Sequence, residues 1–157
     1  MRVVLLGAGH IGQIIASWLS QCGDFQVKVV DRSVVALKAL AHLGTETALV
    51  DTSDPAELRA CMQGFDAVVN ALPYHLALAV ATQAKAAGCH YFDLTEDVHA
   101  TRGIMQLAQG ASTAFMPQCG LAPGFIGIVA HHLSQKFSSL HEVKMRVGAL
   151  PAFPTNA

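Results

Sequence analysis

Short apolar runs alternate with stretches of helical periodicity along almost the whole chain. Residues 2–6 carry a short apolar run, whereas the apolar residues of 11–22 recur every three or four positions, as on one face of a helix. The same alternation continues, and it predicts strands over 27–31, 45–50, 66–73, 89–93 and 112–117 and helices over 33–43, 54–64, 75–87, 96–109 and 125–137. Strands that alternate with helices in this way are typical of βα units in a parallel sheet.

The predicted fold is a doubly wound α/β domain with helices on both faces of the sheet, a three-layer α/β/α arrangement of the Rossmann type. Right-handed crossovers place its strands in the order 3-2-1-4-5-6. Residues 141–150 alternate apolar Val143, Met145 and Val147 with polar neighbours, which predicts a seventh strand at or beyond the edge.

Two local expectations follow from the same patterns. The helix over 125–137 is expected to bury its apolar residues, which are Ile126, Ile128, Val129 and Leu133. We expect Thr95 to cap the helix that begins near Glu96, because a threonine directly before a helix accepts a hydrogen bond from a free backbone amide.

A glycine motif, Gly7-Ala8-Gly9-His10-Ile11-Gly12, lies where the first strand passes into the first helix. Gly7 permits a tight turn, Gly9 leaves room for a pyrophosphate, and Gly12 lets the helix pack closely on the strand. The unpaired amides around His10 and Ile11 and the helix dipole favour a bound anion. The motif predicts a dinucleotide site; the alternative is an ordinary turn that binds nothing.

Acidic residues at the ends of the next two strands refine this hypothesis. Asp31 ends the second strand, where a dinucleotide-binding fold places the acid that accepts hydrogen bonds from the adenosine ribose. Its charge favours NAD over NADP, although Arg32 next to it is able to hold a 2′-phosphate or stack on adenine. Asp51 ends the third strand and either meets the adenine amino group or is a solvated loop acid.

The loop after the fourth strand is the other predicted part of the cofactor site. Residues 70–75 lie at the end of the buried fourth strand, which is predicted to pair with the first strand on the side opposite the second; ligands bind between the first and fourth strands in such sheets. We therefore expect Asn70, Ala71 and Pro73 to overhang the pyrophosphate and the nicotinamide ribose, with the Asn70 side chain offering both a donor and an acceptor.

Composition limits the classes of partner and location. The 157 residues suit one domain. The net charge is -1 and acids and bases are well mixed along the chain, so the sequence has no basic cluster typical of proteins that bind nucleic acid or an anionic membrane. The four cysteines are widely spaced, so we interpret them as free thiols and expect no metal site. The first residues form a strand rather than a signal segment, and no apolar run is long enough to span a bilayer, which predicts a cytoplasmic protein without membrane partners.

Several segments together resemble the saccharopine dehydrogenase and lysine dehydrogenase family. The stretches that carry the resemblance are Gly7 to Gly12, Asp31-Arg32, Asn70-Ala71-Leu72-Pro73-Tyr74, residues 87–96 with their Asp93-Leu94-Thr95-Glu96, residues 119–124, and Val147-Gly148-Ala149-Leu150-Pro151. The glycine motif is shared with many dehydrogenases, whereas the DLTE and CGLAPG stretches are more specific.

The resemblance covers nearly the whole chain but only about the first half of such an enzyme. It implies a domain over 1–140 that binds NAD or NADP and, over 141–157, an edge strand and the start of a second domain that supplies much of the substrate pocket and commonly makes a homodimer. We therefore expect a fragment that binds the cofactor but does not turn over an amino acid by itself.

The resemblance also implies the chemistry and the residues near it. Family members transfer a hydride between an amino-acid carbon that bears the amine and the nicotinamide, with lysine or saccharopine as substrates. Tyr74 or His75 is placed to relay a proton, although both types more often pack or cap at a helix start. Asp93, Thr95 and Glu96 are placed near the substrate amine. We interpret Cys119 as a small residue that lines the ring pocket, because no nearby base activates it as a nucleophile.

Two other classes of function remain open. A nucleotide-sensing Rossmann module, like the regulatory domains of potassium transporters, also carries a glycine turn and a ribose acid, but does not explain the DLTE and CGLAPG stretches. An interaction domain that has lost its ligand is the third possibility, and the intact glycines and Asp31 disfavour it.

Overall fold

The computed structural model describes residues 1–148, in which strands and helices alternate as the sequence predicts. In chain order, these elements are β1 (Arg2–Leu6), α1 (His10–Gln21), β2 (Gln26–Asp31), α2 (Val34–Lys38), the 3-10 helix η1 (Ala41–Leu43), β3 (Glu46–Leu49), α3 (Pro55–Met62), β4 (Ala67–Asn70), the 3-10 helix η2 (Tyr74–Leu76), α4 (Ala77–Ala87), β5 (His90–Asp93), α5 (Val98–Ala108), β6 (Phe115–Met116) and α6 (Phe125–Ser134).

The described strands form one parallel sheet in the order β3-β2-β1-β4-β5-β6, which confirms the predicted topology. The central strand β1 pairs with β2 on one side and β4 on the other, so that Val4 lies beside both Lys28 and Val68. The chain thus reverses its direction of winding between β1 and β4. Their carboxyl ends flank the crevice in which folds of this kind bind ligands.

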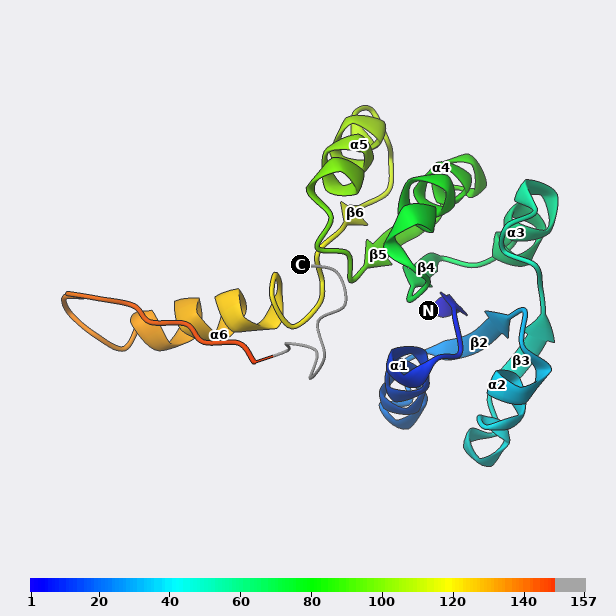
Figure 1. Cartoon of the computed structure of the whole chain (residues 1–157), viewed down its shortest axis with the longest axis horizontal. Helices are drawn as coiled ribbons and strands as arrows, with labels where there is room; N and C mark the ends of the chain where they lie inside the picture. The colour runs from blue at the N-terminus through cyan, green and yellow to red at the C-terminus, as the bar shows by residue number, and fades with distance from the viewer. Residues whose placement is uncertain (149–157) are drawn as a thin grey trace, which may run out of the picture.

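Each face of the sheet packs against its own helices (Figure 1). Leu5 and Val29 point into a core with α1 and α2, which contribute Ala16 and Leu37. Alternate residues of the strands point to the opposite face, where they form the larger core with α3, α4 and α5; these are Val4, Leu6, Val30, Val68 and Tyr91. The helices therefore lie on both faces, as a three-layer fold requires.

Capping residues set where two helices begin. Asp54 caps α3 by accepting hydrogen bonds from the amides of Ala56 and Glu57, at 2.7 and 3.3 Å. At α5, by contrast, the prediction that Thr95 is the cap was wrong. Asp97 caps this helix through the amide of Ala100, because Thr95 Oγ1 instead accepts from the amide of Asp97 at 3.1 Å and orders the turn before the helix.

The segment after β6 departs from the prediction in two ways. No residue of α6 is buried, so the expected burial of its apolar side is wrong: Ile128 is 70% exposed. Figure 1 shows α6 projecting away from the layers. Residues 141–148 form no strand and join none of the strands of the described sheet; the end of the predicted seventh strand falls outside the described residues.

Candidate functional site

The turn between β1 and α1 has the shape that its glycines require. Gly7 has a φ of +101°, and a Cβ there would lie 2.9 Å from the carbonyl oxygen of Ala71. A Cβ at Gly12 would collide with the carbonyl oxygen of Gly7, whereas one at Gly9 would meet nothing within 4 Å. The turn is therefore packed tightly against the protein at Gly7 and Gly12 and open at Gly9.

Helix α1 begins directly at this opening. Gly9 is its N-cap and has no side chain with which to satisfy the free amides of the first turn. His10 and Ile11 are the first helical residues, and both are exposed. A twelve-residue helix whose first turn carries no acidic residue leaves its positive end available to an anion.

Asp31 lies beside the glycine turn, at the end of β2. One carboxylate oxygen accepts a hydrogen bond from the amide of Ala8 at 2.7 Å, and the other accepts from the amide of Ser33 at 2.7 Å. A carboxylate oxygen is able to accept two hydrogen bonds, and each of these two oxygens accepts one from the protein, so the side chain retains acceptor capacity toward a ligand. Arg32 is exposed and forms no salt bridge within residues 1–148.

The carboxylate of Asp51 is turned into its own loop. It accepts hydrogen bonds from the amide of Ser53 at 3.0 Å and from the Ser53 hydroxyl at 2.6 Å. These hydrogen bonds hold the pKa of Asp51 below its ordinary value, with a smaller contribution from the charge of Arg32. Asp51 remains exposed at the end of β3.

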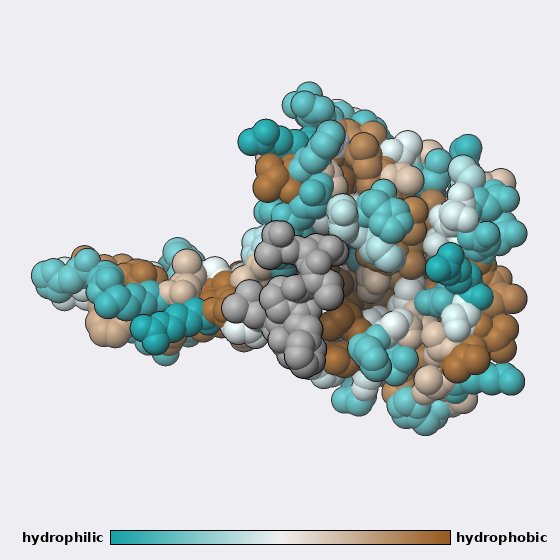
Figure 2. All heavy atoms as spheres, viewed as in Figure 1, coloured by the Kyte–Doolittle hydropathy of each residue, from teal (hydrophilic) through white to brown (hydrophobic). Residues whose placement is uncertain are grey.

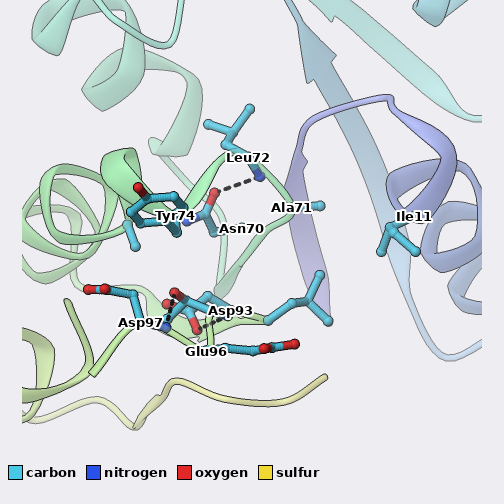
Figure 3. Close-up of a pocket in the computed structure, with 11 residues that line it drawn as sticks. Ile11, Asn70, Ala71, Leu72, Tyr74, Asp93, Glu96 and Asp97 are labelled. Carbon is cyan, nitrogen blue, oxygen red and sulfur yellow. Dashed lines mark hydrogen bonds between the residues drawn. The ribbon is translucent and has the colours of Figure 1, made fainter. Parts of the chain in front are cut away.

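A pocket of about 530 Å³ lies at the carboxyl ends of β4 and β5 (Figure 3). Figure 3 shows Ile11 on one side of the opening, Tyr74 on the other, and Asp93, Glu96 and Asp97 below them. The residues that line it are Ile11, Asn70, Ala71, Leu72, Tyr74, Ala77, Asp93, Leu94, Thr95, Glu96 and Asp97. The fold thus brings the start of α1 together with the two loops that the sequence singled out.

The predicted site residues divide between this pocket and its surroundings. Ile11, Asn70, Ala71, Tyr74 and Glu96 line it. The remaining predicted residues do not, and they are Gly7, Gly9, His10, Gly12, Asp31, Arg32, Asp51, Pro73, His75 and Cys119. The first five of these belong to the glycine turn and the acid beside it, so the predicted residues form two adjoining regions, one at the turn and one beyond β4 and β5.

Asn70 is buried, and both groups of its side-chain amide have partners inside the protein. Its carbonyl oxygen accepts from the amide of Leu72 at 3.1 Å, and its Nδ2 donates to the hydroxyl of Tyr91 at 3.2 Å. The second Nδ2 hydrogen and the second lone pair of the carbonyl oxygen remain for a ligand. The predicted contact of Asn70 with the cofactor therefore stays a prediction that depends on these two positions.

Of the residues predicted to handle protons or the substrate amine, Tyr74, His75 and Glu96 are exposed, whereas Asp93 and Thr95 are buried. Tyr74 and His75 belong to the short helix η2, and their rings meet edge to face with centroids 5.9 Å apart. Tyr74 is 62% exposed, and Glu96 is also exposed at the pocket wall. Their positions leave all three accessible to a ligand.

Cys119 lies in the loop after β6, close to the pocket but outside its lining. Its thiol donates to the carbonyl oxygen of Met116 at 3.3 Å. Burial raises the pKa of the Cys119 thiol, and the charge of Asp93 raises it further. Both effects favour the protonated thiol, which agrees with its interpretation as a residue that is not a nucleophile.

Sequence reasoning missed a group of residues behind the pocket. Tyr91 reads as an ordinary core aromatic in a strand, yet its hydroxyl donates to Asp93 at 2.7 Å. Gln118 is a non-glycine residue with a φ of +67°, and its amide donates to the other oxygen of Asp93 at 3.1 Å. The one signal in the sequence is an acid that ends an apolar strand, which by itself does not reveal these partners.

Within residues 1–148, no three His, Cys, Asp or Glu side chains gather in a geometry that would hold a metal ion. No helix of this part of the chain is long and apolar enough to cross a membrane.

The chain is similar to known proteins in both its sequence and its fold. The profile of the family described as "Saccharopine dehydrogenase NADP binding domain" matches residues 3–116. Saccharopine dehydrogenase (L-Glu forming) from Saccharomyces cerevisiae is similar with a TM-score of 0.73 and 24% identity, over 85% of this chain and 31% of that one. The WlbA dehydrogenase from Chromobacterium violaceum, in complex with NADH and UDP-GlcNAcA, gives a TM-score of 0.63 and 19% identity, over 87% of this chain and 40% of that one.

A structure of another class is also similar. The TrkA-N domain of an inner membrane protein from Escherichia coli has a TM-score of 0.61 and 16% identity, over 85% of this chain and 95% of that one. At these identities the structural similarities establish the fold alone. This chain spans less than half the length of both dehydrogenases.

Proposed function

Because the chain belongs to the family of saccharopine dehydrogenase NADP binding domains, we propose that it is the cofactor-binding part of an oxidoreductase that acts on a carbon–nitrogen bond of an amino acid. The family makes it a domain that binds a nicotinamide dinucleotide. The single observation that carries the proposal is the Asp31 carboxylate, 2.7 Å from the amide of Ala8 and beside an open glycine turn.

We propose that the cofactor pyrophosphate lies over Gly9, where the backbone leaves open space. The amides of His10, Ile11 and Gly12 have no partner within their own helix and are able to donate to its oxygens. Tight packing at Gly7 and Gly12 supports this placement because it fixes the start of the helix directly below that space.

Asp31 would bind the adenosine ribose and Arg32 would lie at its edge. Two amide donors already orient the Asp31 carboxylate, and its charge disfavours a 2′-phosphate at the same position. NAD is therefore the cofactor we propose first. NADP is the alternative, because the exposed guanidinium of Arg32 is available to a phosphate. Asp51 would meet the adenine amino group through Oδ2, because both hydrogen bonds from Ser53 end on Oδ1.

The nicotinamide half and the substrate would share the pocket beyond β4 and β5. When bound, the nicotinamide ring accepts or returns the hydride, and the protein holds the substrate against it. Glu96 and Asp97 at this pocket would attract the ammonium group of a substrate such as lysine or saccharopine. Tyr74 or His75, both exposed at the rim, would relay a proton, and Cys119 would border the ring.

Other expectations from the sequence stay predictions. These are the division into a cofactor domain over 1–140 and the start of a second domain over 141–157, the homodimer and the cytoplasmic location. The chain spans only 31% of the yeast saccharopine dehydrogenase. Among residues 1–148, the pocket is lined from the start of α1, from the end of β4 through the start of α4, and from the end of β5 through Asp97. We therefore expect this chain to bind the cofactor without turning over an amino acid.

A nucleotide-sensing module is the second candidate function. The chain shares its fold with the TrkA-N domain over 95% of that structure, which leaves this candidate open. The family match over residues 3–116 favours the oxidoreductase. Lysine- or saccharopine-dependent formation of NADH, by this chain or by a longer protein that contains it, would distinguish an enzyme from a sensor.

A fluorescence titration tests the cofactor site. We expect NADH to bind saturably to the wild-type chain and Asp31→Ala to weaken binding at least about tenfold, because a charge-assisted hydrogen bond contributes roughly 1.5–3 kcal/mol. Glu46→Ala is the matched control: it removes an exposed carboxylate, paired with Lys28, at the amino end of β3, whereas Asp31 lies at the carboxyl end of the neighbouring β2. Titration of NADPH into the wild type and into Arg32→Ala, compared with NADH, distinguishes NAD from NADP as the cofactor. Equal NADH affinity in the wild type and Asp31→Ala would contradict the proposed site.

A further inference from the structure

Asp93 is a buried carboxylate at the point where the ends of β4, β5 and β6 converge. It is 2% exposed, and in the ladder it lies beside Asn70, the last residue of β4. A carboxylate in such a position is stable only when hydrogen bonds replace the water that it has lost. Its partners therefore show which parts of the structure depend on it.

These partners come from both loops that border the pocket. Asp93 Oδ1 accepts from the amide of Thr95 at 3.0 Å and from the amide of Gln118 at 3.1 Å. The backbone carbonyl of Asp93 accepts from the amide of Cys119 at 2.7 Å. One residue thus joins the loop after β5 to the loop after β6.

The other carboxylate oxygen extends the connection to β4. The Tyr91 hydroxyl donates to Asp93 Oδ2 at 2.7 Å and accepts from Asn70 Nδ2 at 3.2 Å. Burial raises the pKa of the Tyr91 hydroxyl, and its hydrogen bond to Asp93 raises it further, so the phenol remains a donor. The ends of three adjacent strands are linked through these side chains.

The backbone of Gln118 adopts a conformation that its hydrogen bond to Asp93 stabilises. Its φ of +67° lies in the left-handed region, which a non-glycine residue occupies at a cost in energy. The hydrogen bond from its amide to Asp93 favours this conformation, which turns the chain toward Cys119 and Gly120. The loop after β6 therefore takes its course partly from Asp93.

We propose that Asp93 is the positioning residue of the nicotinamide half of the site, and that it sets the spacing between the loops after β5 and β6. This inference rests on the proposed function, in which that half of the cofactor lies beyond β4 and β5. Asp93 acts through its neighbours, because its oxygens are occupied by three donors, whereas Glu96 on the same loop is exposed to a substrate.

The test compares two probes on the full chain. NADH spans both halves of the site, whereas ADP-ribose lacks the nicotinamide ring; if the wild type prefers NADPH, the matching pair is NADPH and 2′-phospho-ADP-ribose. We expect Asp93→Ala to weaken NADH binding about tenfold and to change ADP-ribose binding by less than about twofold. The ratio of the two dissociation constants is the readout that a merely structural role would not move.

Two further variants keep the test decisive if Asp93→Ala does not fold. In Asp93→Asn the side-chain oxygen is able to keep both amide donors while its NH2 donates to Tyr91, whose hydroxyl already lies 3.2 Å from the carbonyl oxygen of Ala77. We expect this variant to retain NADH affinity within about threefold. Tyr91→Phe removes the hydroxyl that joins Asp93 to Asn70, together with its hydrogen bond to the carbonyl oxygen of Ala77, and keeps both amide donors to Asp93. We expect it to lower the affinity for NADH but not for ADP-ribose.

The outcomes separate the two proposals. Equal losses for NADH and ADP-ribose, or no change in either, would overturn the positioning role while the cofactor site stands. A wild-type chain that binds neither probe would overturn the proposed function, and this inference with it.

Discussion

At the scale of single residues, the glycines of the first turn have different tasks. Gly12 is in contact with the Gly7 carbonyl, so the turn closes only if residue 12 has no side chain. Gly9 has open space around it and a φ of -67°, which any residue adopts. The absence of a side chain at Gly12 is therefore needed for folding, whereas the open space at Gly9 matters for binding a ligand.

This difference predicts two distinct phenotypes. Gly12→Ala should destabilise the fold by about 1–3 kcal/mol, because the added methyl collides with backbone. Gly9→Ala should leave the melting temperature nearly unchanged but weaken NADH binding, because its methyl occupies the space proposed for the pyrophosphate. Thermal melts and NADH titrations on both variants check this.

Gly127→Ala in α6, where a Cβ also meets nothing, is the control for a harmless methyl group. If Gly9→Ala binds NADH as tightly as the wild type, the pyrophosphate does not lie over this turn.

At the scale of the elements, periodicity predicted almost every strand and helix, because the helices of the layers bury one apolar face and the central strands are short apolar runs buried on both faces. The Asp54-Pro55 start of α3 was predictable as well, since the signal is local. At α5 both Thr95 and Asp97 are residues that cap helices, and the sequence does not show which of them reaches a free amide.

The predicted burial of α6 failed for a different reason. A helical pattern shows that a helix has an apolar side, but it does not show that another surface is present to cover it. The links among Asn70, Tyr91 and Asp93 were equally hidden, because they depend on the register between β4 and β5. Sequence alone thus identified the loops of the candidate site but not what holds them together.

The two caps give a prediction at this scale. Asp54→Ala and Asp97→Ala should each lower the free energy of unfolding by about 1 kcal/mol, because each leaves helix amides unsatisfied. Only Asp97 also lines the pocket, so only Asp97→Ala should affect binding of the nicotinamide half. Urea denaturation and NADH titration measure the two effects, and a stability loss at α3 alone would show that α5 has another cap.

At the scale of the whole molecule, the described chain consists of a layered domain and an arm. Both buried cores lie in the layers, whereas α6 contributes no buried residue. Figure 2 shows hydrophobic and hydrophilic residues mixed along the projecting arm, in keeping with the exposure of Phe125 and Ile128. The cofactor site therefore depends on the layers and on the loops at their edge.

The central claim is that a nicotinamide dinucleotide crosses the edge of the sheet, from Asp31 over the glycine turn to the pocket. The most direct measurement is an amide NMR titration of the full chain with NADH. Saturable shifts of the amides of residues 8–12 and 31–33, together with those of 94–97, are the predicted result, and Asp31→Ala should abolish them at the same concentrations. Saturable binding that leaves residues 8–12 unperturbed, or no binding at all, would contradict the account.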